Sequence, residues 1–369
     1  MKIRRIEIRL LDLPLREPFA APHGTITSRE LVVVRIETEL GEGWGECSAL
    51  PEPTYTTEFA AGAYLLLDEE LAPRLIGLDL APDQVATRLA TVPGNPMAKA
   101  ALEMAVLDAR LRHDGQPLAR FLGGEAEHVP AGVAVGLAPV ADVVGRVAAL
   151  ADEGYRRVKV KIQPGHDREV VEQLVLRFPD LETQVDGNGS FRSEHAATVA
   201  AMAGAGVAAV EQPFGPDQTG LAAALVKEST VPVVADESAT SVAAVKRLHR
   251  AAALSGVSIK PPRLGGLLAA RALHDHCRAG GVTATVGGML ECGLGRHALA
   301  ALASLPGFGL TGDVSPAGRW LAADPWPDLA MADGRITVPT TPGVAGDPNP
   351  LVLERHTVKQ TIVGGARPR

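Results

Sequence analysis

The sequence has few cysteines and no long hydrophobic run, and both absences narrow its class. Its 369 residues include 3 cysteines, far apart at Cys47, Cys277 and Cys292. This predicts neither a disulfide framework nor a cysteine-type zinc site, and it favours the cytoplasm. No run of about 18 apolar residues occurs, so no membrane-spanning helix is expected. The first residues alternate apolar and charged side chains, which indicates a strand and not a signal peptide.

The sequence also has fewer basic residues than acidic ones. Lys and Arg number 36 against 43 Asp and Glu, a formal net charge of −7 at pH 7. This balance is a poor match for nucleic acid or an anionic membrane, so neither is an expected partner. Hydrophobic residues (46%) and charged residues (21%) are in the ordinary globular range, and the length allows two or three domains.

Strand patterns followed by helix patterns predict a small α+β domain over residues 1–128. The C-terminal residues 319–369 are rich in Pro and Gly, and their alternating piece 335–339 is expected to return to this first domain. The elements expected in the first domain are strands at 3–10 and 31–36, a turn between paired strands at 41–45, and helices at 58–71 and 96–113.

Residues 129–318 repeat a different pattern, in which short β-rich runs alternate with Ala-rich helical runs. Eight such units predict an α/β fold, a (β/α)₈-type TIM barrel capped by the N-terminal α+β domain. The length is tight for eight units, so at least one is expected to lack a full helix. The predicted strands are 131–136, 156–162, 181–186, 207–211, 232–236, 257–260, 282–287 and 308–313, with helices such as 139–153, 193–205, 221–228, 242–252 and 267–279 between them.

Five successive predicted strands end in an ionisable residue. These residues are Lys161, Asp186, Glu211, Asp236 and Lys260, spaced 24 or 25 residues apart. The carboxyl ends of the strands form the active-site face of such a barrel. Any one of these residues alone is more often a strand-end cap or an ion-pair partner, but the regular series predicts an active site.

The predicted strand order places the three acids on neighbouring strands and the two lysines on opposite sides of the ring. Three carboxylates together repel one another and take up protons unless a cation compensates them. Oxygen ligands without histidine favour a hard cation over zinc. We therefore predict that Asp186, Glu211 and Asp236 bind Mg²⁺, with Mn²⁺ as the alternative ion.

Lys159 lies two residues before Lys161, so both side chains point to the same face of one strand. Two lysines inside a barrel require carboxylate partners or anionic ligands. A second charge beside Lys161, with a divalent cation nearby, is expected to lower the pKa of Lys161 and let it act as a base. Asn188 and Glu237 are expected beside the metal ligands, although a loop-capping role explains them equally well.

Other conspicuous residues belong to no motif. His23, His249 and His297 are predicted to be surface or packing residues. The segment 263–266 after Lys260 contains a glycine pair, which suits either a close approach to a ligand or the entry turn of a helix. No phosphate-binding loop, nucleophile elbow or dinucleotide fingerprint is present.

In this order the motifs resemble the enolase superfamily and its muconate-lactonizing subgroup. The motifs are Lys159-x-Lys161, Asp186-Gly-Asn188, Glu211-Gln-Pro213, Asp236-Glu-Ser238 and Ile259-Lys-Pro261. Within that subgroup the chain is similar to the o-succinylbenzoate synthase / N-succinylamino acid racemase family, also called N-acylamino acid racemases. This closer resemblance, which extends over nearly the whole chain, is carried by segments 17–19, 43–47, 97–108, 287–296 and 312–315.

The resemblance implies an enzyme that uses Mg²⁺ to remove the proton α to a carboxylate and stabilises the resulting ene-diolate. The three acids would bind the metal, Lys161 would take the proton from one face, and Lys260 would stand at the other face. In racemisation Lys260 returns a proton. In dehydration to o-succinylbenzoate, Lys161 acts first as base and then as acid, while Lys260 stabilises the intermediate.

The resemblance also implies a small carboxylate substrate with a succinyl group, a homo-oligomer and, for the synthase activity, a place in menaquinone biosynthesis. Both activities fit one site, because both substrates carry a succinyl arm and a carboxylate beside the reacting carbon. Phe19 and Tyr55 would pack over the substrate, with plain interdomain packing as the alternative. The substrate contacts implied are Phe19, Tyr55, Gly288, Met289 and Leu290.

Two positions depart from the family pattern, and two alternative functions remain. Ala134 stands where a serine is frequent near the substrate, and Pro262 stands where glycine is usual, which stiffens that loop. One alternative is another reaction of the superfamily, such as dipeptide epimerisation or muconate-type cycloisomerisation, to be decided by loops 18–30 and 52–58. The other is a non-catalytic scaffold that binds a metal or a carboxylate. Segment 312–315 lacks the D-x-D of dipeptide epimerases, and a scaffold has no need of two opposed lysines.

Overall fold

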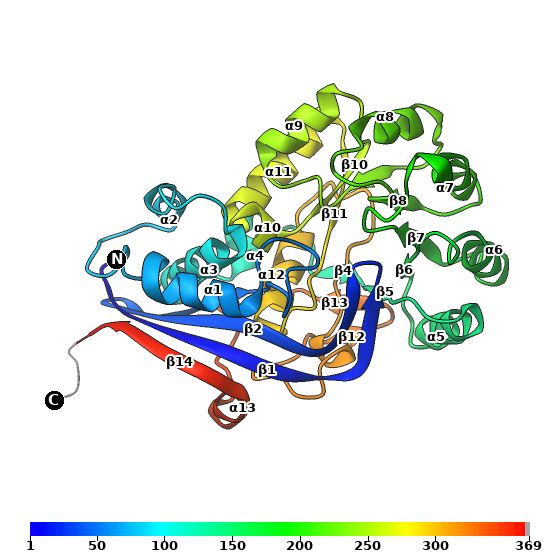
Figure 1. Cartoon of the computed structure of the whole chain (residues 1–369). Coiled ribbons are helices and arrows are strands. Elements are labelled where there is room, and N and C mark those ends of the chain that lie inside the picture. The colour runs from blue at the N-terminus through cyan, green and yellow to red at the C-terminus, as the bar shows by residue number, and fades with distance from the viewer. Residues whose placement is uncertain (366–369) are drawn as a thin grey trace.

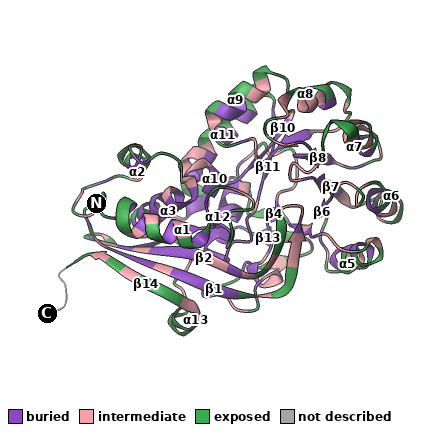
Figure 2. Cartoon of the chain, in the orientation of Figure 1, coloured by how far each residue is buried: buried purple, intermediate pink, exposed green. Residues whose placement is uncertain are grey.

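The alternating runs after residue 129 build a parallel sheet that curls into a barrel, as the computed structural model of residues 1–365 shows (Figure 1). Seven strands follow one another in chain order across the sheet. Almost every residue of these strands is buried, which is typical of parallel strands covered by helices on the outside (Figure 2). The strands are β5 (Gly132–Val135), β6 (Arg157–Lys161), β7 (Glu182–Asp186), β8 (Ala209–Glu211), β9 (Val233–Ala235), β10 (Gly256–Ile259) and β11 (Thr283–Val286).

Helices join these strands, and the predicted helical runs fall on them. Among the described residues no helix is both long and apolar enough to cross a lipid bilayer. The barrel helices are α5 (Val140–Asp152), α6 (Arg168–Arg177), α7 (Ala196–Ala203), α8 (Thr219–Glu228), α9 (Val242–Arg250), α10 (Pro261–Leu264), α11 (Leu267–Gly280) and α12 (Gly293–Ala303).

The eighth predicted strand, 308–313, is not a regular strand, and this part of the prediction is wrong. The segment still closes the barrel, because Asp313 N donates to Val286 O at 2.7 Å and Gly132 N donates to Val314 O at 3.1 Å. A Cβ atom on Gly312 would lie 2.8 Å from the carbonyl oxygen of Val286, so the close contact at this position leaves no room for a side chain. Only a 3₁₀ turn, Ala317–Arg319, follows, which confirms that one unit lacks a full helix.

The N-terminal residues form an antiparallel sheet with helices on one face, as the α+β prediction requires (Figure 1). The strands predicted at 3–10 and 31–36 are parts of longer ones, and the helix predicted at 96–113 is confirmed. The elements are β1 (Ile3–Ala21), β2 (Gly24–Thr38), β3 (Gly41–Cys47), α1 (Ala60–Leu66), a π-helical turn (Leu67–Leu71), α2 (Gln84–Arg88), α3 (Pro96–His113) and α4 (Leu118–Leu122).

The turn predicted at 41–45 is wrong, because these residues belong to β3. The glycines there allow helix α3 to lie directly on the strand. A Cβ atom on Gly43 would collide with the carbonyl oxygen of Ala105, and one on Gly45 with that of Ala101. Close packing against a helix therefore explains this glycine pair, and a turn does not.

The C-terminal prediction is wrong in detail. The alternating piece 335–339 contains β13 (Arg335–Thr337), which pairs with β4 (His128–Pro130) and β12 (Met331–Ala332) and not with the first sheet. The return is made later in the chain, by α13 (Pro350–His356) and by β14 (Thr357–Gly364), which pairs antiparallel with β1. The division into domains 1–128, 129–318 and 319–369 stays a prediction.

A buried carboxylate joins the N-terminal layer to the barrel. Glu103 of α3 is 3% exposed and accepts hydrogen bonds from Leu267 N at 3.1 Å and Leu268 N at 2.8 Å. These amides are at the start of α11, where the first N–H groups have no partner within the helix. Glu103 therefore caps a barrel helix from the other layer and holds the two in register.

We expect Glu103→Ala to lower the free energy of unfolding by about 1–3 kcal/mol, because a buried amide and a partly buried amide lose their acceptor. Urea titration followed by circular dichroism measures this change. Glu69→Ala, at an exposed carboxylate, is the control and should be nearly neutral. Equal effects of the two substitutions would contradict the capping role.

The same carboxylate predicts a pH effect. Burial raises the pKa of Glu103 from 4.5 to about 7. The folded chain therefore binds this proton more tightly than the unfolded chain does, and the stability it contributes is present below pH 4.5 and lost as the pH rises through 7. The free energy of unfolding should fall more steeply across this window in the wild type than in Glu103→Gln. Parallel profiles in urea titrations at several pH values would refute the assignment.

Candidate active site

Three carboxylates meet at the carboxyl ends of neighbouring strands. Asp186 ends β7, Glu211 ends β8, and Asp236 follows β9 directly. All three are at most 1% exposed, and one oxygen of each lies within 4.8 Å of the others. Glu211 Oε2 is buried without a hydrogen-bond partner among residues 1–365. The structure thus brings together the three predicted ligands, and this carboxylate cluster suits a divalent cation.

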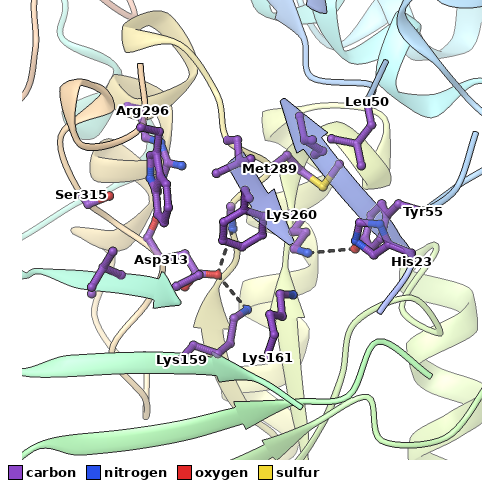
Figure 3. Close-up of a pocket in the computed structure, with 18 residues that line it drawn as sticks. His23, Leu50, Tyr55, Lys159, Lys161, Lys260, Met289, Arg296, Asp313 and Ser315 are labelled. Carbon is purple, nitrogen blue, oxygen red and sulfur yellow. Dashed lines mark hydrogen bonds and ion pairs between the residues drawn. The ribbon is translucent and has the colours of Figure 1, made fainter. Parts of the chain in front are cut away.

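The two lysines flank the carboxylate cluster. Lys161 Nζ donates to Asp186 Oδ2 at 2.7 Å and to Asn188 Oδ1 at 2.8 Å. Lys260 Nζ donates to Asp236 Oδ2 at 2.7 Å. Their strands, β6 and β10, are separated by the three strands that carry the acids. Both side chains point into one cavity (Figure 3), so the expected arrangement of two lysines on either side of the acids is present.

Lys159 lies deeper than Lys161 and is fully paired. Its Nζ lies 2.8 Å from Asp313 Oδ2 (Figure 3). It also lies 2.8 Å from Glu211 Oε1 and 3.5 Å from Asp186 Oδ2. Burial by itself would lower the pKa of Lys159, but Asp313, Glu211 and Asp186 raise it well above its ordinary value. Lys159 is therefore a fixed positive charge in the wall of the cavity. Its effect on the pKa of Lys161 stays a prediction.

Asn188 and Glu237 lie beside the carboxylate cluster, where they were expected. Asn188 accepts from Lys161 and donates through Nδ2 to Glu237 Oε1 at 2.8 Å, while its backbone N donates to Asp186 Oδ1 at 3.0 Å. Burial and the charge of Asp236 raise the pKa of Glu237 to about 7. The pair thus orients Lys161 through one amide side chain.

Arg263 is a member of this site that the sequence analysis missed. Its Nη1 donates to Asp236 Oδ1 and to the hydroxyl of Tyr55, both at 2.7 Å. Burial by itself would raise the pKa of Asp236, but Lys260 and Arg263 hold it well below its ordinary range. The sequence did contain a signal for Arg263, namely its position three residues after Lys260. Pro261 and Pro262 begin the short helix α10, and the first turn of this helix brings Arg263 back over the end of the strand.

Asp313 was also missed, although it ends the predicted eighth strand. Its carboxylate pairs with Lys159 and with the buried Arg157. The rule that selected the five other strand ends would have selected it too. The segment that carries Asp313 therefore contributes a charge to the site even without regular strand pairing.

The cavity is lined from both layers of the fold. The five residues expected to contact substrate all line it, namely Phe19, Tyr55, Gly288, Met289 and Leu290, and Ala134 lines it as well. The prediction for His23 is wrong, because this residue lines the cavity next to Tyr55, with ring centroids 5.4 Å apart. Burial and the charge of Lys161 lower the pKa of His23 to about 4, so its ring is neutral at pH 7. The tight turn between β1 and β2 places His23 there, and no sequence motif marks it.

Comparison with known proteins agrees with this geometry. Residues 5–123 match the family "Mandelate racemase / muconate lactonizing enzyme, N-terminal domain", and residues 142–351 match "Enolase C-terminal domain-like". The chain is 39% identical to an N-succinylamino acid racemase of Amycolatopsis, covering 99% of this chain and 100% of the relative. It is 34% identical to an o-succinylbenzoate synthase of Bacillus subtilis, covering 98% of both. A solved enolase-superfamily structure from Listeria innocua has a TM-score of 0.94 at 31% identity, covering 98% of this chain and 99% of that one.

The carboxylate cluster predicts cation binding that depends on Glu211. We expect Glu211→Gln to weaken Mg²⁺ binding about tenfold or more, because one of three anionic ligands loses its charge. Calorimetric titration with Mg²⁺ alone measures the affinity. The matched control is Glu103→Gln, a buried carboxylate outside the cluster, which should bind as the wild type does. Unchanged affinity in Glu211→Gln would rule out the cluster as the cation site.

Proposed function

Since the chain belongs to the mandelate racemase / muconate lactonizing enzyme family, in the enolase superfamily, we propose that it is a Mg²⁺-dependent o-succinylbenzoate synthase, an N-succinylamino acid racemase, or both. The observation that carries the proposal is the pair Lys161 and Lys260 on either side of three buried carboxylates in one cavity. The relatives that bear these two names favour it over other reactions of the superfamily and over a non-catalytic scaffold.

The lysines would move the protons. Mg²⁺ held by Asp186, Glu211 and Asp236 would neutralise the charge that develops on the substrate carboxylate when the α-proton leaves. In racemisation Lys161 takes the α-proton from one face, and Lys260 delivers a proton to the other. In dehydration Lys161 takes the α-proton and then protonates the departing hydroxyl, which leaves as water, while the charge of Lys260 stabilises the intermediate.

The upper part of the cavity would hold the rest of the substrate. Phe19, Met289 and Leu290 present an apolar surface that fits the side chain or ring of a small carboxylate with a succinyl arm. The Tyr55 hydroxyl accepts from Lys260 Nζ at 2.8 Å and donates to Asp236 Oδ2 at 2.8 Å, so it holds the lysine in place. Closing these residues over the substrate would exclude water from the reacting carbon.

The proposal extends to the compartment, the oligomeric state and the biosynthetic role of the enzyme. The three cysteines are free and buried, in line with a reducing compartment, so we place the protein in the cytoplasm. The resemblance further supports a homo-oligomer and, for the synthase activity, a place in menaquinone biosynthesis.

We expect Lys161→Ala and Lys260→Ala each to lower racemisation of N-succinyl-phenylalanine by about 10²–10⁴-fold, because each removes one acid–base group. Proton NMR in D₂O with Mg²⁺ follows α-proton exchange, polarimetry follows racemisation, and a parallel assay detects o-succinylbenzoate. The lysine left in each variant faces one enantiomer. Residual exchange should therefore come from opposite enantiomers in the two variants.

Lys246→Ala, at an exposed lysine, is the control and should keep wild-type rates. Near-normal racemisation by either active-site variant would contradict the two-base assignment. Formation of o-succinylbenzoate without racemisation by the wild type would restrict the proposal to a synthase. Neither reaction by a wild type that binds Mg²⁺ would show that the proposed substrates are wrong.

A further inference from the structure

Arg29 lies outside the carboxylate cluster and is completely buried, with 0% of its surface exposed. It belongs to β2, where it pairs with Leu13 of β1. Arginine is rarely buried to this degree unless both its charge and its N–H donors are matched. The partners of Arg29 therefore show which parts of the fold it holds together.

The guanidinium of Arg29 donates to four backbone carbonyls. Nε donates to Leu290 O at 2.9 Å, Nη1 to Ala49 O at 2.8 Å and also to Glu30 O, and Nη2 to Ser48 O at 2.7 Å. Leu290 belongs to the loop after barrel strand β11, whereas Ser48 and Ala49 follow strand β3 of the N-terminal layer. One planar group thus ties together two loops from different layers, which the fixed fork of an arginine can do and a lysine cannot.

The two loops carry an apolar wall of the cavity. Leu50 comes from the loop after β3, and Met289 comes from the loop after β11 (Figure 3). Leu290 follows Met289 in the second loop and lines the same cavity. Leu290 has a φ of 56°, in the left-handed region that residues other than glycine seldom adopt. Its carbonyl is held by Arg29, and the neighbouring Met289 N donates to Glu291 Oε1 at 2.7 Å. The direction of the Leu290 side chain therefore depends on a backbone that Arg29 and Glu291 hold by hydrogen bonds.

The charges of two buried carboxylates act on Arg29. Burial lowers the pKa of Arg29, and the charges of Glu46 and Glu291 oppose that shift. Glu46 accepts from Ser48 Oγ at 3.0 Å and from Gly295 N at 2.9 Å, so it too joins the two layers. Arg29 is not one of the described residues that line the cavity. The polar contacts of its guanidinium are thus made with backbone carbonyls of the protein.

We propose that Arg29 is a positioning residue that holds the wall of Leu50, Met289 and Leu290, and so sets which substrate side chain the cavity prefers. This inference rests on the proposed function. Loss of the guanidinium fork frees the wall without removing a proton-transfer group or a metal ligand. It therefore alters the discrimination between large and small side chains more than it alters the rate of proton transfer.

The test compares kcat/KM for N-succinyl-phenylalanine and N-succinyl-alanine in Arg29→Lys, which keeps the charge and loses the fork. We expect the ratio between the two substrates to change about tenfold, through KM for the larger one, with kcat changed by less than about threefold. The matched control is Arg112→Lys. Arg112 also donates to a backbone carbonyl, that of Ala345 at 2.8 Å, but it does not line the described cavity. Its ratio should stay at the wild-type value.

An unchanged ratio in folded Arg29→Lys overturns the inference. If that variant does not fold, Glu291→Gln takes its place, because it keeps an acceptor for Met289 N and removes a charge that acts on Arg29. It should shift the ratio in the same direction, and an unchanged ratio again overturns the inference. A wild type inactive on both substrates contradicts the proposed function and the inference with it, whereas an active wild type with unchanged variants contradicts the inference alone.

Discussion

The rest of the structure depends on one electrostatic constraint, the close approach of three buried carboxylates. Oxygens within 4.8 Å of one another and shielded from water repel strongly. Positively charged side chains around the cluster offset this repulsion. They are Lys159, Lys161, Lys260 and Arg263. Each acid has at least one of them as a partner. The arrangement concentrates negative charge at one point while its surroundings are positive, which suits a divalent cation and an anionic substrate together.

The topology of the barrel brings these charged residues together. Parallel strands end at one face, so residues about 25 positions apart in sequence become neighbours. Carboxylates one strand apart form the cluster, and lysines four strands apart form its flanks. The N-terminal layer then closes the open face, and Glu103 holds it to the barrel by capping α11. Charge placement and layer placement are thus two consequences of the same topology.

Regular features could be predicted from the sequence, and irregular ones could not. Strand ends repeat at a fixed interval, which located the acids and lysines, and the strong pattern of 96–113 located its helix. The failures share a cause, namely a contact made by a distant segment. Gly43 is predicted to lie in a turn, but helix α3 packs directly on it. Segment 308–313 is predicted to be a strand, but Gly312 makes a close contact with the backbone of Val286. His23 reaches the cavity only because a long hairpin carries it there.

Tyr55 shows why the N-terminal layer is more than a cover. Its hydroxyl contacts Lys260 and Arg263 and donates to Asp236, so a residue of this layer completes the hydrogen bonding of a candidate metal ligand and a candidate base. Without this hydroxyl the Lys260 ammonium and the Arg263 guanidinium would each lose an acceptor, and the Asp236 carboxylate would lose a donor. The hydrogen bonding of the lysine at the end of β10 is therefore complete only where the N-terminal layer lies on the barrel. One hydroxyl group makes that connection between the two layers.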